Sequence, residues 1–258
     1  MADWKSAVRR VLYPAYEARL VRRLPADRLP KHVGVMLDGN RRWARAVGAD
    51  VAHGHRAGAA NISPFLGWCE DLGVEVVTLW LLSTDNLNRP ADELTDLLAI
   101  ITEVVDDLAA ERRWRLNPVG ALDLLPAGTA RRLKEASDRT SDIDGVIVNV
   151  AVGYGGRREI ADAVRALLQE QASNGMSIEE LAGTISVEHI ARHLYTKGQP
   201  DPDLVIRTSG EQRLGGFLLW QSAHSEFYFC EAYWPDFRRV DFLRALRAYA
   251  ERERRFGA

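Results

Sequence analysis

The fold is decided by residues 33–45, Val33-Gly34-Val35-Met36-Leu37-Asp38-Gly39-Asn40-Arg41-Arg42-Trp43-Ala44-Arg45. The apolar run 33–37 predicts a short buried strand. Asp38-Gly39-Asn40 predicts a turn, and Asn40 is expected to cap a helix that starts at Arg41. A strand that leads into a helix N-terminus presents free backbone N–H groups to an anion.

The charged side chains of this stretch indicate what the anion is. Arg41, Arg42 and Arg45 add full positive charges beside the turn. The Asp38 carboxylate would repel a phosphate group unless a divalent cation, usually Mg²⁺, bridges the two. The stretch therefore predicts a site for Mg²⁺ and a diphosphate or triphosphate. The alternative is a surface turn whose charges form salt bridges.

Outward from this stretch, strands alternate with helices. This pattern predicts a single α/β domain over residues 1–258, with a mostly parallel central sheet flanked by helices and an N-terminal helical arm at 1–28. The predicted strands cover 33–37, 74–82, 118–124, 146–152, 204–206 and 227–230. Helices are expected at 4–24, from 41, and at 54–71, 91–112, 127–139, 158–173, 187–195 and 239–255.

Four of the predicted strands end in polar motifs. These motifs are DGNRR at 38–42, STDNLNRP at 83–90, GYGGRR at 153–158 and RTSGEQR at 207–213. Ligands of open α/β sheets bind outside the carboxyl ends of the strands, so we expect the four motifs to meet at one edge of the sheet, which argues for an active site there. Five of their arginines, which can bind phosphate oxygens in bidentate fashion, suit two diphosphates with Mg²⁺: Arg41, Arg42, Arg89, Arg207 and Arg213.

Composition excludes several classes of protein. The formal net charge is −2 and no basic stripe is interleaved with aromatics, which argues against a nucleic-acid partner. Cys69 and Cys230 lack metal-site spacing, and no signal peptide or membrane span is visible, so we expect a cytoplasmic protein. The arginine-rich face of 4–24 could contact an anionic membrane surface, and the alternative is a solvated helix packed on the body.

Other nucleotide and hydrolase motifs are absent. Arg158 holds the third glycine position of the dinucleotide fingerprint after 153–156, and no P-loop is present. Thr208-Ser209-Gly210 lacks the frame of a hydrolase elbow.

The motifs together resemble those of the cis-prenyltransferases, the family of undecaprenyl diphosphate synthase. The resemblance covers Leu29 to Gly257 and includes DGNRRWA at 38–44, GH at 54–55, STDNLNRP at 83–90, NVAVGYGGR at 149–157 and the run 203–229. GYGGRREI and the leucine-rich loop are most similar to short-chain members that make (2Z,6E)-farnesyl diphosphate. The resemblance implies an apolar product cavity and Mg²⁺-dependent condensation of isopentenyl diphosphate with an allylic diphosphate, of which geranyl diphosphate is favoured.

The resemblance also assigns roles to residues. It implies that Asp38 holds Mg²⁺ and assists departure of the allylic diphosphate, that Glu226 is a second Mg²⁺ ligand, and that Asn86 stands at the position described as proton acceptor. A neutral amide is a poor base, so we expect Asn86 to orient the substrate. The allylic-site residues are Gly39, Asn40, Arg41, Arg42, Trp43 and His55. The loop residues are Ser83, Thr84, Asp85, Leu87 and Arg89. The isopentenyl diphosphate residues are Arg207, Arg213, Leu214 and Gly215.

Chain length and assembly are further expectations. Leu81 matches a position that is small in long-chain relatives, so it is expected to plug the product cavity. Strand alternation places Leu81 and Leu82 on opposite faces, so only one can be the plug. The tail, with Arg255 and Gly257, matches a family signature that implies a homodimer. The alternatives are a long-chain undecaprenyl or decaprenyl diphosphate synthase and a non-catalytic partner subunit.

Four positions depart from the usual family pattern. Val51 replaces an arginine, Asp85 a glutamate, Leu87 a tryptophan and Gly215 a serine. Each departure removes a polar or aromatic contact, which bears on the identity and affinity of the allylic substrate more than on the reaction type.

Overall fold

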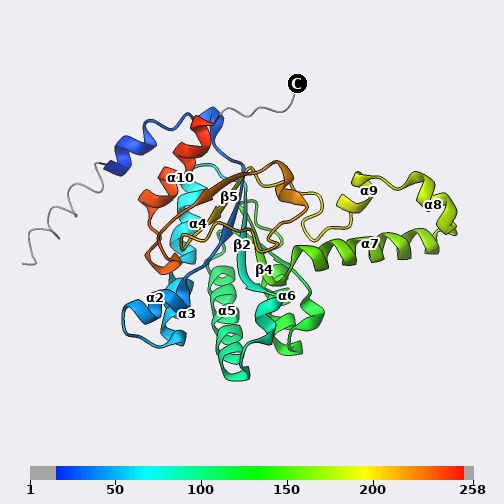
Figure 1. The fold of residues 1–258 in the computed structure, drawn as a ribbon, viewed down its shortest axis with the longest axis horizontal. Helices are drawn as coiled ribbons and strands as arrows, with labels where there is room; N and C mark the ends of the chain where they lie inside the picture. Colours follow the sequence, from blue (N-terminus) through cyan, green and yellow to red (C-terminus); the bar gives the residue numbers. More distant parts are fainter. Residues whose placement is uncertain (1–15, 253–258) are drawn as a thin grey trace, which may run out of the picture.

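A computed structural model describes residues 16–252 of the chain (Figure 1). Within these residues the strands form one six-stranded sheet, ordered β3-β4-β2-β1-β5-β6, in which every neighbouring pair is parallel. The strands are β1 His32–Met36, β2 Val76–Ser83, β3 Arg115–Val119, β4 Ile147–Tyr154, β5 Leu204–Arg207 and β6 Glu226–Phe229. The predicted α/β class with a parallel sheet is confirmed.

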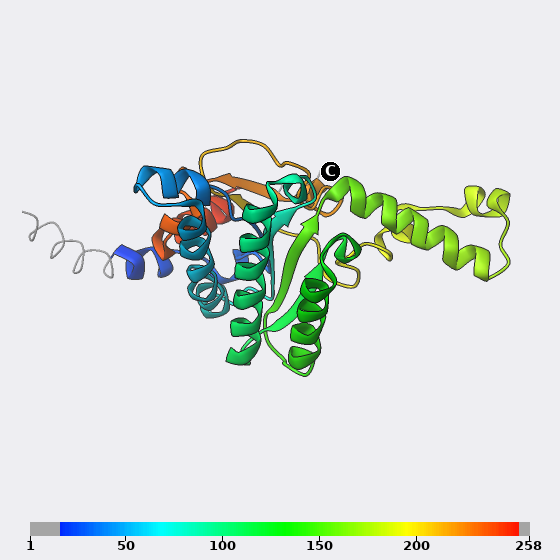
Figure 2. The same cartoon turned by 90° about the horizontal axis from the view of Figure 1, so that it is seen from below.

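Helices connect the strands. They are α2 Asn40–Ala46, α3 Val51–Ala60, α4 Ile62–Asp71, α5 Ala91–Glu111, α6 Ala127–Thr140, α7 Gly156–Ser173, α8 Ile178–Thr184, α9 Val187–Ala191 and α10 Arg239–Glu251. Short 3₁₀ turns occur at η1 Ala26–Arg28, η2 Asp85–Asn88, η3 Leu122–Leu124, η4 Gln221–His224 and η5 Trp234–Asp236. Figure 2 shows α7 and α8 extending away from the body of the sheet.

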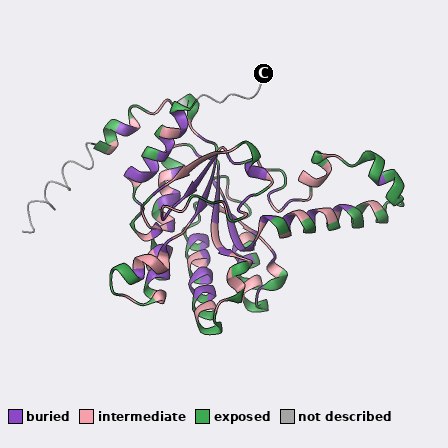
Figure 3. Cartoon of the chain, viewed as in Figure 1, coloured by how far each residue is buried: buried purple, intermediate pink, exposed green. Residues whose placement is uncertain are grey.

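The sheet is buried on both faces, as its continuous apolar strands require (Figure 3). On one face, Val33 and Val35 of β1 join a large core with side chains from α4, α5, α6 and α10. On the other face, Met36 and Tyr154 pack with Phe217 and Leu218 of the segment after β5. Most of the described helices therefore cover one face, and irregular chain covers much of the other.

The predicted elements differ from the observed ones in three places, two of which lie in the body of the fold. The helix expected at 54–71 is two helices, because Asn61 ends α3 and its Nδ2 donates hydrogen bonds to the backbone oxygens of Trp234 and Phe237, both at 2.9 Å. The strand expected at 118–124 lies at 115–119, on the sheet edge. An edge position tolerates Pro118, which lacks a backbone donor.

The third difference lies in the arm beyond α7. The helix expected at 187–195 ends at Ala191, and α8 is an additional helix. Its start carries a capping box in which Ser177 Oγ accepts from the Glu180 N–H and Glu180 bonds back to the Ser177 N–H. This S-x-x-E spacing is a sequence signal that could have revealed the helix.

The predicted N-terminal arm is only partly described. Residues 1–15 lie outside the described structure, and residues 16–21 are helical. Leu20 is buried against Val240 and Leu243 of α10, so this part of the arm packs on the body. Among the described residues, the helices are too short or too polar to cross a membrane.

Candidate active site

A cavity of about 580 Å³ opens at the carboxyl ends of three adjacent strands, β2, β1 and β5. The chain winds from β1 to one side through β2 and returns to the other side through β5, so the cavity lies where the winding direction reverses. Its lining residues are Met36, Leu37, Asp38, Gly39, Asn40, Arg41, Arg42, Arg45, His55, Trp80, Leu81, Leu82, Ser83, Asp85, Asn86, Arg89, Leu97, Arg207, Glu211, Arg213 and Gly215.

All four polar motifs lie at the carboxyl edge of the parallel sheet, as expected, and three of them line this cavity. The end of β4 is separated from β1 by β2. Residues 153–158 instead support the loops that carry the site. The Thr84 N–H donates to the Tyr154 carbonyl at 3.0 Å, and the Gly156 N–H donates to the Gly216 carbonyl at 2.9 Å.

The turn after β1 depends on glycine. Gly39 is the N-cap of α2 with a φ of 108°, a left-handed conformation that favours glycine, and no side chain caps the helix. The prediction that Asn40 is the cap is therefore wrong: Asn40 is the first helical residue. Its side chain is directed at α3, because a Cβ at Gly58 would lie 2.4 Å from Asn40 Oδ1. That buried oxygen has no hydrogen-bond partner among the described residues.

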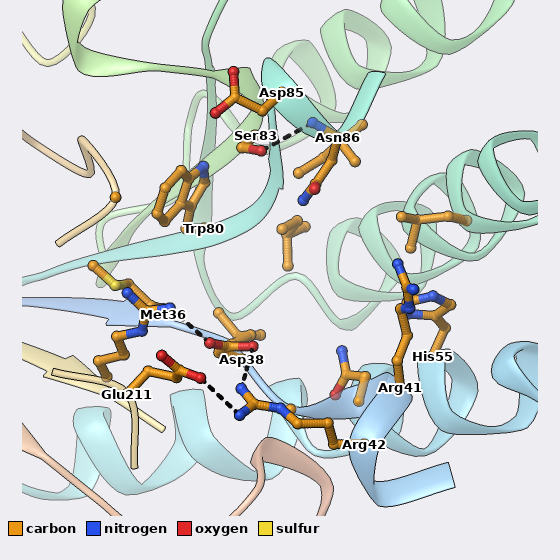
Figure 4. Close-up of a pocket in the computed structure, with 18 of the residues that line it drawn as sticks. Met36, Asp38, Arg41, Arg42, His55, Trp80, Ser83, Asp85, Asn86 and Glu211 are labelled. Atoms are coloured by element: carbon orange, nitrogen blue, oxygen red, sulfur yellow. Dashed lines mark hydrogen bonds and ion pairs between the residues drawn. The ribbon is translucent and has the colours of Figure 1, made fainter. Parts of the chain in front are cut away.

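Asp38 is held by arginines from two elements (Figure 4). Arg207 Nη2, at the end of β5, donates to Asp38 Oδ2 at 2.8 Å, and Arg42 Nη2, one turn along α2, donates to Oδ1 at 3.3 Å. Burial alone would raise the pKa of Asp38, but hydrogen bonds from Arg207 and Ser209 and the two arginine charges hold that pKa below its usual value. The carboxylate is therefore ionised near neutral pH.

The two arginines of the turn face different sides of the cavity (Figure 4). Arg42 Nη2 donates to Ser209 Oγ at 2.7 Å, and its Nη1 donates to Glu211 Oε1 at 3.0 Å. Arg41 Nη1 lies 3.5 Å from Glu93 Oε1 in the first turn of α5. The cavity thus has arginines on both sides, which suits two anionic groups rather than one.

The loop after β2 contributes polar groups between the two arginine sides. The Asn86 N–H donates to Ser83 Oγ at 3.1 Å within the η2 turn. Across from it, His55 is 6% exposed and its ring nitrogens have no hydrogen-bond partner among the described residues. Burial, followed by the charge of Arg89, lowers the pKa of His55. His55 is therefore neutral near pH 7, with its ring nitrogens available to a ligand.

Comparison with known proteins identifies the family. Residues 36–257 match the prenyltransferase family model described as putative undecaprenyl diphosphate synthase. The chain is 63% identical over 247 residues to a (2Z,6E)-farnesyl diphosphate synthase of Thermobifida fusca, covering 95% of this chain and 97% of the relative. The chain belongs to the cis-prenyltransferase family.

Other relatives agree with this assignment. The cis-prenyltransferase described here is 56% identical over 250 residues to a short-chain Z-isoprenyl diphosphate synthase of Mycobacterium bovis, covering 95% of each chain. Its fold matches the crystal structure of lavandulyl diphosphate synthase from Lavandula x intermedia in complex with dimethylallyl diphosphate. The TM-score is 0.83 and the identity 31%, over 88% of this chain and 98% of that one.

Several residues that the sequence assigned to the site do not line the cavity of this cis-prenyltransferase. Trp43 stacks on His53, Leu87 packs on the main core, and Leu214 packs on the core of the other face. Thr84 lies in the turn behind Ser83 and contacts Gly155 of the β4 motif. Arg255 and Gly257 lie outside the described residues.

Glu226 is the largest departure from the predicted site. It is the first residue of β6 and pairs in register with Leu204, at the opposite end of β5 from Arg207. Its carboxylate accepts a hydrogen bond from Arg252. Within this chain Glu226 and Asp38 are therefore at different ends of the sheet, and the expected pair of metal ligands does not form.

Sequence reasoning also missed residues that line the cavity. Glu211 lies within the RTSGEQR motif without a predicted role, and Trp80 lies within a strand that is predicted to be buried. Strand alternation could have placed Trp80, because its side chain faces the side opposite Leu79. Leu97 of α5 carries no such signal, since its contact depends on how α5 packs against β2.

A second, apolar cavity of about 40 Å³ adjoins the first. Leu81 lines both cavities, together with Leu37, Asn40, His55 and Leu97. The β2–β4 register shifts between Trp80 and Leu82, so a bulge interrupts the alternation that the sequence argument assumed. Leu82 is 1% exposed and lines only the polar cavity, which places Leu81 between the two.

The donor set is suited to Mg²⁺ only when a phosphate ligand is also present. Asp38, Asp85 and Glu211 are the acids that line the cavity, and residues 16–252 contain no group of three or more His, Cys, Asp or Glu side chains that could hold a metal ion. Mg²⁺ usually binds through one or two carboxylates, substrate phosphates and waters. The ionised Asp38, surrounded by phosphate-binding arginines, matches that requirement.

Proposed function

We propose that this cis-prenyltransferase condenses isopentenyl diphosphate with a short allylic diphosphate, preferably geranyl diphosphate, and releases (2Z,6E)-farnesyl diphosphate and diphosphate. The observation that carries the proposal is the joining of two cavities at Leu81, one lined by arginines and Asp38 and one small and apolar. The names of the relatives at 63% and 56% identity support the short product.

The two arginine sides of the cavity would bind the two diphosphates. Arg41, Arg89 and His55 border the side that adjoins the apolar cavity, so we assign the allylic diphosphate to them. Arg207 and Arg213 follow β5 on the other side, and Arg42, which the resemblance assigns to the allylic site, donates to Glu211 and Ser209 of the same segment. We therefore assign these three arginines to isopentenyl diphosphate. Holding both reactants in one site turns a bimolecular encounter into an oriented reaction.

The reaction breaks the allylic C–O bond and one C–H bond and forms one carbon–carbon bond. The allylic C–O bond ionises, and its electron pair leaves with the diphosphate. The alkene of isopentenyl diphosphate attacks the allylic cation, and a proton then leaves C2 of the isopentenyl unit to give the new Z double bond. The arginines stabilise the leaving diphosphate, where negative charge develops.

The basicity of the nearby groups indicates which of them accepts the proton. Asn86 lines the cavity on a turn fixed by Ser83, but a neutral amide does not accept a proton at neutral pH. We assign Asn86 to orientation of the isopentenyl unit and the proton to a diphosphate oxygen.

Asp38 is the residue that would hold Mg²⁺, with substrate phosphate oxygens as further ligands. When bound, the ion acts as a Lewis acid that stabilises charge on the diphosphate. Arg207 and Arg42 neutralise Asp38. A diphosphate that engages these arginines would free the carboxylate, so we expect the metal and the diphosphate to bind together.

Two alternatives are less well supported. A non-catalytic partner subunit would lack the reactive groups, yet Asp38, Asn86, Arg207 and Arg213 all line the cavity. A long-chain synthase is disfavoured by the bulky Leu81 between the two cavities and by the names of the relatives at 63% and 56% identity.

The proposal extends to assembly and location. We propose a homodimer, because the tail with Arg255 and Gly257 matches the family signature and because α8 and the start of α9 expose Ile178 at 77% and Val187 at 62%. We propose a cytoplasmic location and peripheral membrane contact through the arginine-rich face predicted for 4–24, which binding to anionic vesicles would test.

The direct test supplies purified protein with labelled isopentenyl diphosphate, Mg²⁺ and one starter at a time: dimethylallyl, geranyl or farnesyl diphosphate. The expected result is one condensation, fastest with geranyl diphosphate. Incorporation with none of the starters would overturn the proposal.

A further inference from the structure

Two carboxylates outside the predicted site separate Arg41 from Arg42. These neighbours in sequence extend to opposite sides of the cavity (Figure 4). Arg41 Nη1 lies 3.5 Å from Glu93 Oε1 on α5, whereas Arg42 Nη1 donates to Glu211 Oε1 at 3.0 Å on the loop after β5.

Each carboxylate also holds a second arginine that comes from another motif. Arg89 Nη1 donates to Glu93 Oε1 at 3.0 Å, and His55 Nε2 lies 3.8 Å from the same oxygen. On the other side, Arg213 Nη1 donates to Glu211 Oε2. We call Glu93, Arg41, Arg89 and His55 the Glu93 cluster, and Glu211, Arg42 and Arg213 the Glu211 cluster.

The clusters need these acids because two guanidinium groups repel each other and have long, flexible stems. The Glu93 and Arg89 side chains are only 19% and 18% exposed, so water screens this pair less than an ordinary surface ion pair. In the Glu211 cluster, Arg213 is 68% exposed, and Glu211 is its only acidic partner among the described residues. Without the acid, each arginine would sample many rotamers.

Neither acid is suited to bind a diphosphate, because like charges repel. Removing its charge would relieve that repulsion but would also release two arginines. An arginine has five N–H donors, and the contact with the acid uses only part of them, so the remaining donors stay available to phosphate. The acid therefore weakens diphosphate binding only slightly, and it fixes the direction in which the arginine donors point. A role in positioning the arginines is thus favoured over competition with the diphosphate.

We infer that Glu93 and Glu211 are positioning residues, each of which fixes an arginine pair for a different diphosphate. Glu93 sets the affinity for the allylic diphosphate, and Glu211 sets the affinity for isopentenyl diphosphate. This inference rests on the proposed function, since it uses the assignment of one diphosphate to each side.

The test compares Glu93→Gln with Glu211→Gln, so that each variant is the control of the other. Glu93→Gln should raise the KM for geranyl diphosphate by roughly five- to thirtyfold, the effect of freeing one or two arginine side chains, and leave the KM for isopentenyl diphosphate nearly unchanged. Glu211→Gln should do the reverse. In both variants kcat should fall by less than KM rises.

Asp92→Asn is a matched surface control. Asp92 is also an acid in the first turn of α5, but it is exposed and makes no ion pair among the described residues. Asp92→Asn removes the same charge from the N-terminus of α5 as Glu93→Gln does. It should change neither the KM for geranyl diphosphate nor the KM for isopentenyl diphosphate. Glu93→Asp separates positioning from charge: it keeps the charge but shortens the reach, so positioning predicts a raised KM for geranyl diphosphate.

Binding without turnover completes the experiment. Calorimetry would measure isopentenyl diphosphate alone and an unreactive geranyl thiolodiphosphate, and both Kd values should show the crossed pattern. Equal weakening of both ligands in each variant, or tighter binding after loss of the charge, would overturn the inference while the proposed function stands. A wild-type protein that binds neither probe would overturn both.

Discussion

Arg207 and Asp38 lie at the ends of neighbouring strands, and Arg207 Nη2 donates to Asp38 Oδ2 at 2.8 Å. The Arg207 side chain is only 9% exposed, and the carboxylate is 32% exposed toward the cavity. The pair therefore joins a buried arginine that is proposed to bind phosphate to the cavity acid that is proposed to hold Mg²⁺. Because its carboxylate is exposed toward the cavity, Asp38 belongs to the site rather than to the hydrophobic core.

Asp38→Ala should abolish turnover and leave the fold intact. The loss should exceed roughly 10²- to 10³-fold, the usual effect of removing a group that stabilises developing charge. Asp38→Asn should also be inactive, because it keeps an acceptor for Arg207 but loses the anionic ligand. Steady-state rates and circular dichroism would check both variants. Full activity of either, or wild-type turnover in excess chelator, would contradict the metal-site assignment.

Leu81→Ala should lengthen the product. The substitution removes three carbons between the polar cavity and the apolar one, so a growing chain gains room. Because Leu81 is only partly buried, its loss should cost less than the roughly 2–5 kcal/mol of a fully buried leucine. Chromatography of the dephosphorylated products would measure chain length.

Leu82→Ala is the control for that experiment. Leu82 is 1% exposed and does not line the apolar cavity, so the variant should lose more stability without a longer product. An unchanged product profile in Leu81→Ala would rule out Leu81 as the plug.

His32 should make the protein less stable in mild acid. Burial lowers its pKa from 6.5 to about 4 despite the hydrogen bond to the Pro200 carbonyl. The unfolded chain therefore binds a proton more readily than the folded one, and stability falls as the pH drops from about 6.5 to 4. The full effect is about 3 kcal/mol. Urea unfolding of wild type and His32→Gln should show a flatter pH profile in the variant; equal slopes would contradict this account.

Deletion of residues 254–258 should sharply depress turnover. The tail carries Arg255 and the family's C-terminal signature, which implies contact near the isopentenyl diphosphate of the partner in a dimer. Sedimentation and steady-state rates would test both points. A monomeric wild-type protein with normal rates would refute the proposed dimer.

The strands and the polar turns were predictable because each depends on local sequence. The run before Asp38 and the run before Ser83 are apolar and end in turn residues, so both strands were found and their ends were correctly placed at one site. Parallel order then follows from the alternation with helices.

The features that the sequence did not predict depended on tertiary contacts. The break at Asn61 needs two carbonyl acceptors from the segment near Trp234, which lies far along the chain. That the β4 motif lies at the same edge without lining the cavity depends on strand order, which local patterns do not set. Glu226 precedes a short strand, so its place at the opposite end of the sheet from Arg207 appears only once β6 is paired with β5.

The product formed from geranyl diphosphate decides whether this chain makes a short Z-prenyl diphosphate. Purified protein would receive geranyl diphosphate, excess isopentenyl diphosphate and Mg²⁺, and mass spectrometry with NMR would give the length and double-bond geometry of the dephosphorylated product. The account predicts one fifteen-carbon alcohol with a Z bond at C2 and an E bond at C6. Products of fifty carbons or more, or an E bond at C2, would contradict it.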